Sequence, residues 1–284
     1  MAARIKSYFL LGILSGLFVY IGSLFGIDWM IFAFVMALIM NFVSYFMGDK
    51  IVLAMTRAVK VPEDQMPRLH RIVKEVAISA GIPTPAIYII PSGSPNAFAT
   101  GRDPAHSSIA FTQGILELLD ESELKGVIAH EMSHIKNRDV LVATIAATIA
   151  SAIMMIARMI QFAAIFGGDS RDSERSGNIF SVFAMIAFAI LMPIIATLIN
   201  LAISRSREYL ADETGAKLIH NPFALAGALR KLARGVSVAP MNTVNPSISH
   251  LFVVNPFSAK SFLNLFSTHP PIEERIKRLE NMSF

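Results

Sequence analysis

Residues 127–139 read VIAHEMSHIKNRD, and this stretch decides how the rest of the chain is interpreted. On a helix, residues i and i+4 lie one above the other, so His130 and His134 can bind one metal ion together. The intervening Glu131 projects beside them, where it can take a proton from a water and later deliver it to a leaving amine. A chance match has a probability of about 0.007 in this composition. The alternative, a histidine pair on a solvated helix face, is disfavoured by the apolar residues around it.

A catalytic zinc site needs a third protein ligand, and the expected topology restricts where that ligand comes from. The helix that carries the sequence HEMSH ends just before an apolar run that is long enough to cross a membrane. A hairpin of two such runs would return the chain to the same side of the membrane near Glu208. At about 1.5 Å per residue, His134 and Glu208 would both lie roughly 5–10 Å from the membrane surface. Asp212 shares the helix face of Glu208 and can hydrogen-bond a ligand histidine. Glu208 could instead pair with a neighbouring arginine; the weaker candidates for the third ligand are Glu213 and Glu117.

Four uncharged, apolar stretches predict an α-helical membrane protein. Hydrophobic residues make up 54% of the chain and charged residues only 16%, and the mean hydropathy is +0.54. A helix needs about 20 mostly apolar residues to cross roughly 30 Å of hydrocarbon. Buried core helices are the alternative interpretation. The four predicted spans are residues 7–27, 29–48, 140–157 and 177–204.

Basic residues beside these runs predict their orientation, because cytoplasmic loops are enriched in lysine and arginine. Arg4 precedes the first run, whereas the connection at Asp28 carries no basic residue. Lys50 follows the second run, and Arg205 follows the fourth. Both termini and both large polar regions are therefore predicted to face the cytoplasm.

The polar regions indicate an α+β fold with a small sheet. Asp120 and Glu123 are typical of a capping box that opens the helix carrying HEMSH. The absence of cysteine means that any metal site uses histidine and carboxylate ligands. A net charge of +4 without a basic stripe argues against a nucleic-acid partner. Helices are predicted at 62–80, 120–136, 205–219, 223–234 and 271–282, and strands at 86–90, 96–101 and 108–112.

Taken with the four apolar runs, several separate motifs resemble the HtpX-type bacterial membrane zinc metalloproteases, which are related to the CAAX prenyl proteases. The resemblance covers essentially the whole chain and implies a cytosolic α+β zincin-like metalloprotease domain on membrane helices. The motifs, in order, are NAFATG at 96–101, VIAHEMSHIKNRD at 127–139, SRSREYLADETGA at 204–216 and STHPPIEERI at 267–276.

The resemblance also implies a division of the chain and a location. Residues 1–48 would form two transmembrane helices, and residues 49–139 the cytosolic first half of the protease domain with the HEMSH helix. Residues 140–203 would form a transmembrane hairpin, and residues 204–284 the second cytosolic half with the third ligand. The expected location is the inner membrane of a bacterium, as a multi-pass protein.

Residue by residue, the resemblance implies that one Zn²⁺ per chain is bound by His130, His134 and Glu208, with Glu131 as the catalytic acid and base. Asp212 matches an aspartate that supports a ligand histidine. Three further residues are assigned by the resemblance to substrate or transition state. They are His269, which would hydrogen-bond the developing oxyanion, Arg275 near it, and Asn96 at the strand edge that pairs with an extended substrate.

The expected function is cleavage of misfolded or damaged membrane proteins at the cytoplasmic face, as quality control under stress. The expected partners are protein substrates and the lipid bilayer, with no nucleic acid and no nucleotide. A CAAX-type processing protease with a defined substrate is one alternative, and a non-catalytic membrane scaffold is another. Residues 235–262, rich in Asn, Ser and Pro, are predicted to cover the cleft until a substrate enters.

Overall fold

The structure is a computed structural model that describes residues 26–166, 205–241, 244–257 and 270–283, with scattered residues between 11 and 23. The predicted span at 177–204 and most of the predicted span at 7–27 lie outside the described residues. His269 also lies outside them.

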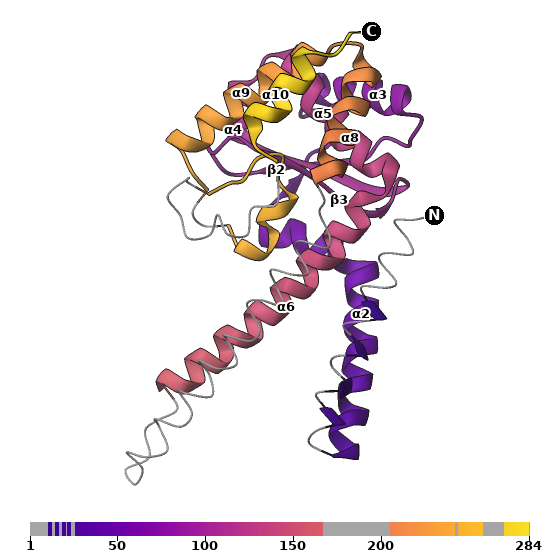
Figure 1. Cartoon of the computed structure of the whole chain (residues 1–284), viewed down its shortest axis with the longest axis vertical. Coiled ribbons are helices and arrows are strands. Elements are labelled where there is room, and N and C mark those ends of the chain that lie inside the picture. Colours follow the sequence, from indigo (N-terminus) through magenta and orange to yellow (C-terminus); the bar gives the residue numbers. More distant parts are fainter. Residues whose placement is uncertain are drawn as a thin grey trace.

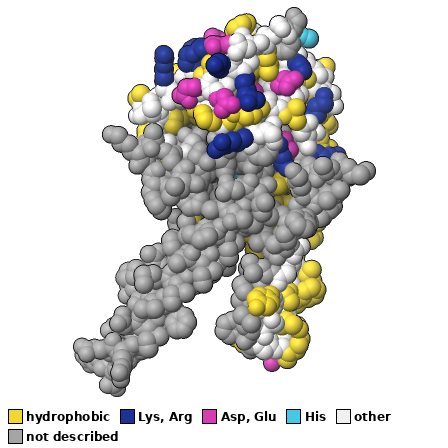
Figure 2. All heavy atoms as spheres, viewed as in Figure 1, with side chains coloured by type: hydrophobic (Ala, Val, Ile, Leu, Met, Phe, Trp, Pro, Cys, Tyr) yellow, Lys and Arg dark blue, Asp and Glu magenta, His cyan; other side chains and the backbone are white. Residues whose placement is uncertain are grey.

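Two long helices, α2 (Ile27–Met55) and α6 (Asp139–Phe166), project from the same side of the main body (Figure 1). On length and composition, α2 can cross a membrane, and it contains the whole predicted span at 29–48. Many of its large apolar side chains are exposed, including Trp29 and Phe42, whereas charged side chains are spread over the main body (Figure 2). Within the described part of the chain, α2 alone passes this test as a single helix.

The sheet has four strands in the order β1-β2-β4-β3, so β3 is an edge strand. Strands β2 and β4 are parallel, and the other two pairs are antiparallel. The three predicted strands all form, whereas the two-residue β1 was not predicted, because it is too short to show a pattern. The strands are β1 (Val59–Lys60), β2 (Ala86–Ile90), β3 (Ala97–Asp103) and β4 (His106–Thr112).

Helices pack around α5, which contacts α3, α8, α9 and β3. The predicted capping box at the start of α5 is confirmed, since Glu123 N–H donates to Asp120 Oδ1 at 2.9 Å. The helix predicted from residue 62 begins only at Pro67, because residues 62–66 form a turn before it. The helices of the body are α3 (Pro67–Ala80), α4 (Gln113–Leu118), α5 (Glu121–Asn137), α8 (Arg205–Ile219), α9 (Pro222–Val238) and α10 (Ile272–Glu280).

The first half of α6 is enclosed by protein. Buried side chains from Val140 to Met154 pack against β3, α2 and the short helix η1 (Pro246–Leu251). Helix α6 follows α5 after an 87° bend at Arg138, whose φ of 62° is in the left-handed region. The sequence predicted a membrane span at 140–157 from its apolar composition. In the structure, the first turns of this stretch form part of the wall around the site described below.

Gly215 is required where α8 crosses α5. A Cβ atom there would lie 2.9 Å from the His130 backbone nitrogen and 3.0 Å from the Ala129 carbonyl carbon. We expect Gly215→Ala to lower the free energy of unfolding by about 1–3 kcal/mol, because the two backbones must separate. Denaturant unfolding in detergent measures this.

Gly227→Ala on α9 is the matched control, since the nearest atom to its new Cβ is the movable Glu123 carboxylate at 3.2 Å. Alanine favours a helix over glycine by about 0.5–1 kcal/mol, so this variant should be no less stable than the parent. Equal stabilities for the two variants would contradict the close crossing of α8 and α5.

Candidate metal centre

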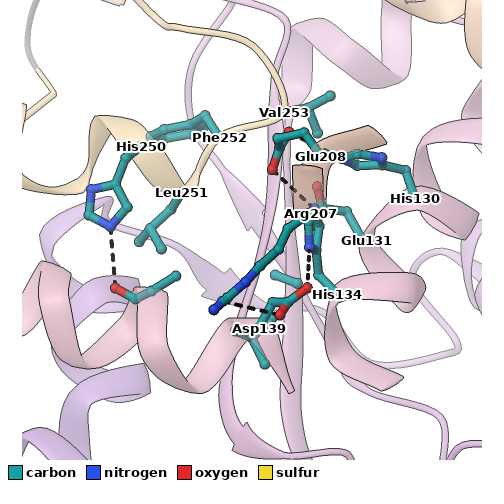
Figure 3. Close-up of a pocket in the computed structure, with 13 residues that line it drawn as sticks. His130, Glu131, His134, Asp139, Arg207, Glu208, His250, Leu251, Phe252 and Val253 are labelled. Atoms are coloured by element: carbon teal, nitrogen blue, oxygen red, sulfur yellow. Dashed lines mark hydrogen bonds and ion pairs between the residues drawn. The ribbon is translucent and has the colours of Figure 1, made fainter. Parts of the chain in front are cut away.

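The structure brings the three predicted metal ligands together in one buried cavity (Figure 3). His130 and His134 lie one turn apart on α5, and Glu208 reaches them from α8. His134 Nε2 lies 3.4 Å from Glu208 Oε1, and His130 Nε2 lies 3.9 Å from Glu208 Oε2. The two weaker candidates are not in this cluster, since Glu213 pairs with Lys217 on the surface and Glu117 lines a separate groove.

These three residues fit a divalent metal ion in geometry. One ligand atom from each lies within 4.8 Å of the others. In a tetrahedral site with bonds of about 2.0–2.1 Å, ligand atoms lie about 3.3–3.4 Å apart, a spacing that His134 Nε2 and Glu208 Oε1 already have at 3.4 Å.

The residues also fit a divalent ion in charge. Four carboxylates surround the two histidines, and two guanidinium groups contact these carboxylates, so two negative charges remain when both histidines are neutral and every carboxylate is ionised. An ion of charge +2 neutralises this remainder. The carboxylates are Glu131, Asp139, Glu208 and Asp212, and the guanidiniums are Arg207 and Arg275.

Behind His130, a buried ion pair fixes the ring. His130 Nδ1 lies 2.9 Å from Asp212 Oδ1, so the aspartate is placed as predicted for support of a ligand histidine. Arg275 Nε and Nη2 donate to Asp212 Oδ2 and Oδ1 at 2.8 and 2.7 Å. The Arg275 guanidinium holds the pKa of Asp212 below its usual value although burial acts in the opposite direction. Asp212 therefore stays an anion beside the Nδ1 atom of His130.

His134 has a corresponding pair that the sequence motifs do not predict. Its Nδ1 lies 3.3 Å from Asp139 Oδ2, and Arg207 Nη1 lies 3.2 Å from Asp139 Oδ1. Asp139 ends the stretch VIAHEMSHIKNRD, but its spacing suggests no role, because it follows His134 by five residues across the bend at Arg138. Each histidine thus has one aspartate and one arginine behind it.

Glu131 lines the cavity and is almost completely buried. Burial, with a contribution from the Glu208 charge, raises the pKa of Glu131 to about 7, although a hydrogen bond from the Ala99 backbone N–H opposes this. A carboxylate with a pKa near neutrality can both accept and return a proton at physiological pH.

Burial has different outcomes at the two histidines. It lowers the pKa of His130, and Asp212 does not compensate fully. Burial also acts to lower the pKa of His134, but the Asp139 hydrogen bond and the charges of Glu208, Glu131 and Asp139 raise it to about 9. In the metal-free protein, His134 is therefore protonated at neutral pH.

Arg275 and Asn96, which were predicted to act near the substrate, are both fully buried. Besides Asp212, Arg275 approaches two of the predicted ligands: its Nη2 lies 3.4 Å from His130 Nε2 and its Nη1 lies 3.7 Å from Glu208 Oε2. The Nδ2 of Asn96 donates to the Val254 carbonyl at 2.8 Å. Both side chains position other parts of the site here, so a catalytic role for Arg275 near His269 and a substrate contact for Asn96 stay predictions.

The segment predicted to cover the cleft contributes one wall of the cavity through residues 250–253. Ile248, Phe252 and Val254 of this segment are buried in the core. Its described part is therefore a structural wall and not a loose cover.

Comparisons with known proteins agree with this geometry. A family model described as peptidase family M48 matches residues 63–283. A protease HtpX homolog of Syntrophobacter fumaroxidans is 52% identical over 284 residues, covering 99% of this chain and 100% of the relative. Another, of Pyrococcus furiosus, is 51% identical over 280 residues, with 98% and 96% covered.

The crystal structure of S. mikatae Ste24p matches with a TM-score of 0.53 at 20% identity. The match covers 98% of this chain but only 65% of Ste24p. At this identity the likeness shows a shared fold.

Asp212→Asn should weaken metal binding about 10–100-fold, because the neutral side chain no longer holds His130 through an anionic acceptor paired with Arg275. Competition with a chelator of known affinity measures this. Glu213→Gln, one residue further on α8 and turned toward Lys217, is the control and should bind metal as the parent does. Equal affinities for both variants would remove Asp212 from the site.

Metal uptake should release about one proton near pH 7.5, since protonated His134 must become neutral to bind. Apparent affinity should therefore rise with pH up to about 9, the pKa of His134 in the metal-free protein. Calorimetry in two buffers with different ionisation enthalpies gives the proton count. Asp139→Asn should reduce the release, and a parent protein that releases no proton would contradict the raised pKa.

Proposed function

Because this chain belongs to peptidase family M48, it is a membrane metallopeptidase, and we propose that it uses one zinc ion to cleave internal peptide bonds of misfolded or damaged membrane proteins. One observation carries the proposal. Two histidines and Glu208 converge within 4.8 Å in a buried cavity, with the Glu131 carboxylate in the same cavity.

His130, His134 and Glu208 would hold the zinc ion, which supplies Lewis-acid polarisation of a peptide carbonyl and lowers the pKa of a water. Glu131 takes the proton of the attacking water and then delivers it to the leaving nitrogen. The position of Glu131 in the same cavity as the three ligands supports both steps. Zinc is favoured over other divalent ions by the two-imidazole, one-carboxylate ligand set.

The remaining site residues would position these groups. Asp212 and Asp139 hold the two histidine rings through their Nδ1 atoms, which leaves both Nε2 atoms toward Glu208. Arg275 keeps Asp212 ionised. His269 is proposed as the oxyanion donor on the strength of the family motif alone.

We place the protein in the bacterial inner membrane, with both termini and the cavity facing the cytoplasm and with the four-part division at 48/49, 139/140 and 203/204. The basic residues Lys50, Arg57 and Lys60 near and beyond the end of α2 support this orientation. The cavity, lined by the first turns of α6, would then lie close to the membrane surface, where loops of membrane proteins are accessible.

Two alternatives make different predictions. A CAAX-type processing protease would cleave one defined peptide and ignore unfolded proteins. A non-catalytic scaffold would keep its metal and its partners but be indifferent to the loss of Glu131.

Glu131→Gln tests the proposal directly. The variant should bind zinc with the affinity of the parent but cleave an unfolded model protein at least about 10³-fold more slowly, because amide nitrogen and oxygen cannot accept and return the proton. Both proteins are purified with chelator and zinc-loaded in detergent before fragments are quantified.

Glu117→Gln, an exposed change of the same chemistry, is the control and should cleave normally. Cleavage by Glu131→Gln at the parent rate would end the catalytic assignment. Zinc binding without any cleavage by the parent protein would favour the scaffold.

A further inference from the structure

The cavity around the metal centre is too small for the substrate that the proposed function requires. Its volume is about 40 Å³, and a single water needs about 10–15 Å³ of such space. The cavity can hold an ion and a few waters but not an extended peptide. As far as the described residues line this cavity, a substrate can therefore reach Glu131 only after one wall has moved.

An extended substrate would pair with the edge of β3 that faces away from β4. On both sides of Ala99, backbone groups of this edge already have hydrogen-bond partners. Val253 N–H donates to the Ala97 carbonyl at 3.0 Å, and Gly101 N–H donates to Thr144 Oγ1 at 3.4 Å. Ala99 itself lines the cavity between them. A peptide that adds to this edge must displace either the segment around Val253 or the start of α6.

The segment around Val253 is held firmly. Val253 and Phe252 are buried in the core, and the Phe252 ring lies 5.2 Å from that of Phe98. The carbonyls of Val253 and Val254 accept from Arg275 and Asn96 at 3.1 and 2.8 Å. Exposing each of the large apolar side chains to water would cost about 1.5–3 kcal/mol. This wall therefore stays in place.

Beyond Asp139, three polar contacts hold the start of α6 to its neighbours. Thr144 Oγ1 lies 2.9 Å from Thr100 Oγ1, in addition to its contact with Gly101, and His250 Nε2 lies 3.3 Å from the Ala143 carbonyl. Hydrogen bonds of this kind contribute only about 0.5–1.5 kcal/mol each. Val140, Leu141 and Val142 at the start of α6 are also buried, so opening this wall carries a hydrophobic cost as well. A substrate that binds in the opened cleft would cover the same side chains.

The bend between α5 and α6 supplies a pivot. Arg138 alone separates the two helices, in the left-handed conformation, at an angle of 87°. Asp139 is next to this pivot and would move least, so it can keep its contacts with His134 and Arg207. Thr144, more than one turn further along α6, would move more.

We propose that the first turns of α6, residues 139–144, are a gate that opens about Arg138 and exposes the edge of β3 from Ala99 to Gly101. Thr144 releases the Gly101 N–H, and the main chain of the substrate takes its place. The identity of the substrate rests on the proposed function. The opening of the gate is a property of the fold, so it is tested by the rate of zinc removal as well as by the rate of cleavage.

The test is a reversible crosslink in Thr100→Cys/Thr144→Cys. The chain has no cysteine of its own, and the two native hydroxyl oxygens are already in contact, so an oxidised pair ties α6 to β3. The zinc-loaded protein is oxidised, then reduced with a phosphine, and each single-cysteine variant receives the same treatment as control. Two rates are measured, cleavage of an unfolded protein and removal of the bound zinc by a bulky chelator.

Oxidation should slow both rates at least tenfold, with unchanged zinc content, and reduction should restore them. Unchanged rates after crosslinking overturn the gate. If no form of the protein cleaves, the proposed function fails, and the chelator rate still decides on the gate.

Should the crosslink not form, Thr144→Val tests the gate in its place. It removes the hydroxyl and keeps the shape, so it should raise kcat/KM for the unfolded protein several-fold and speed zinc removal. Unchanged or lower rates overturn the proposal.

Discussion

The buried pair of Asp212 and Arg275 is the interaction on which the rest of the structure depends. Arg275 has no exposed surface, and a buried guanidinium is tolerated only when charges and acceptors surround it. Its acceptors come from α8 and from the carbonyl of Val253, and it also lies 3.7 Å from Glu208. Helix α10, helix α8 and the wall of the cavity must therefore meet behind His130, which places Glu208 opposite the two histidines.

The electrostatics of the site follow from this constraint. Without metal, the carboxylates around the histidines outnumber the guanidiniums by two. Burial raises the pKa of Glu131, whereas the Asp139 hydrogen bond and the nearby carboxylate charges raise the pKa of His134. Protons thus occupy the place of a divalent ion. Under the proposed function, a bound ion would displace these protons, so metal uptake would be coupled to proton release.

Much of the site could be predicted from local sequence, because the i, i+4 spacing, the capping box and the helix of Glu208 and Asp212 are short-range patterns. The role of Asp139 could not be predicted, because its contact with His134 spans the bend between α5 and α6. The spacing of apolar residues in the sequence does not show where that bend lies. The course of α6 was equally hidden. An apolar run such as 140–157 has the same composition whether lipid or protein surrounds it, and only the packing against β3 and η1 distinguishes the two.

The distance along the chain between the parts of the site has a consequence for biogenesis. His130 and Arg275 are in contact across 145 residues. At a synthesis rate of about 5–20 residues per second, the histidines emerge on the order of ten seconds before the arginine that completes their support. Helices α2 and α6 precede that arginine as well. The order of synthesis therefore delays a fully supported metal centre until after α2, the helix long and apolar enough to cross a membrane, has been made.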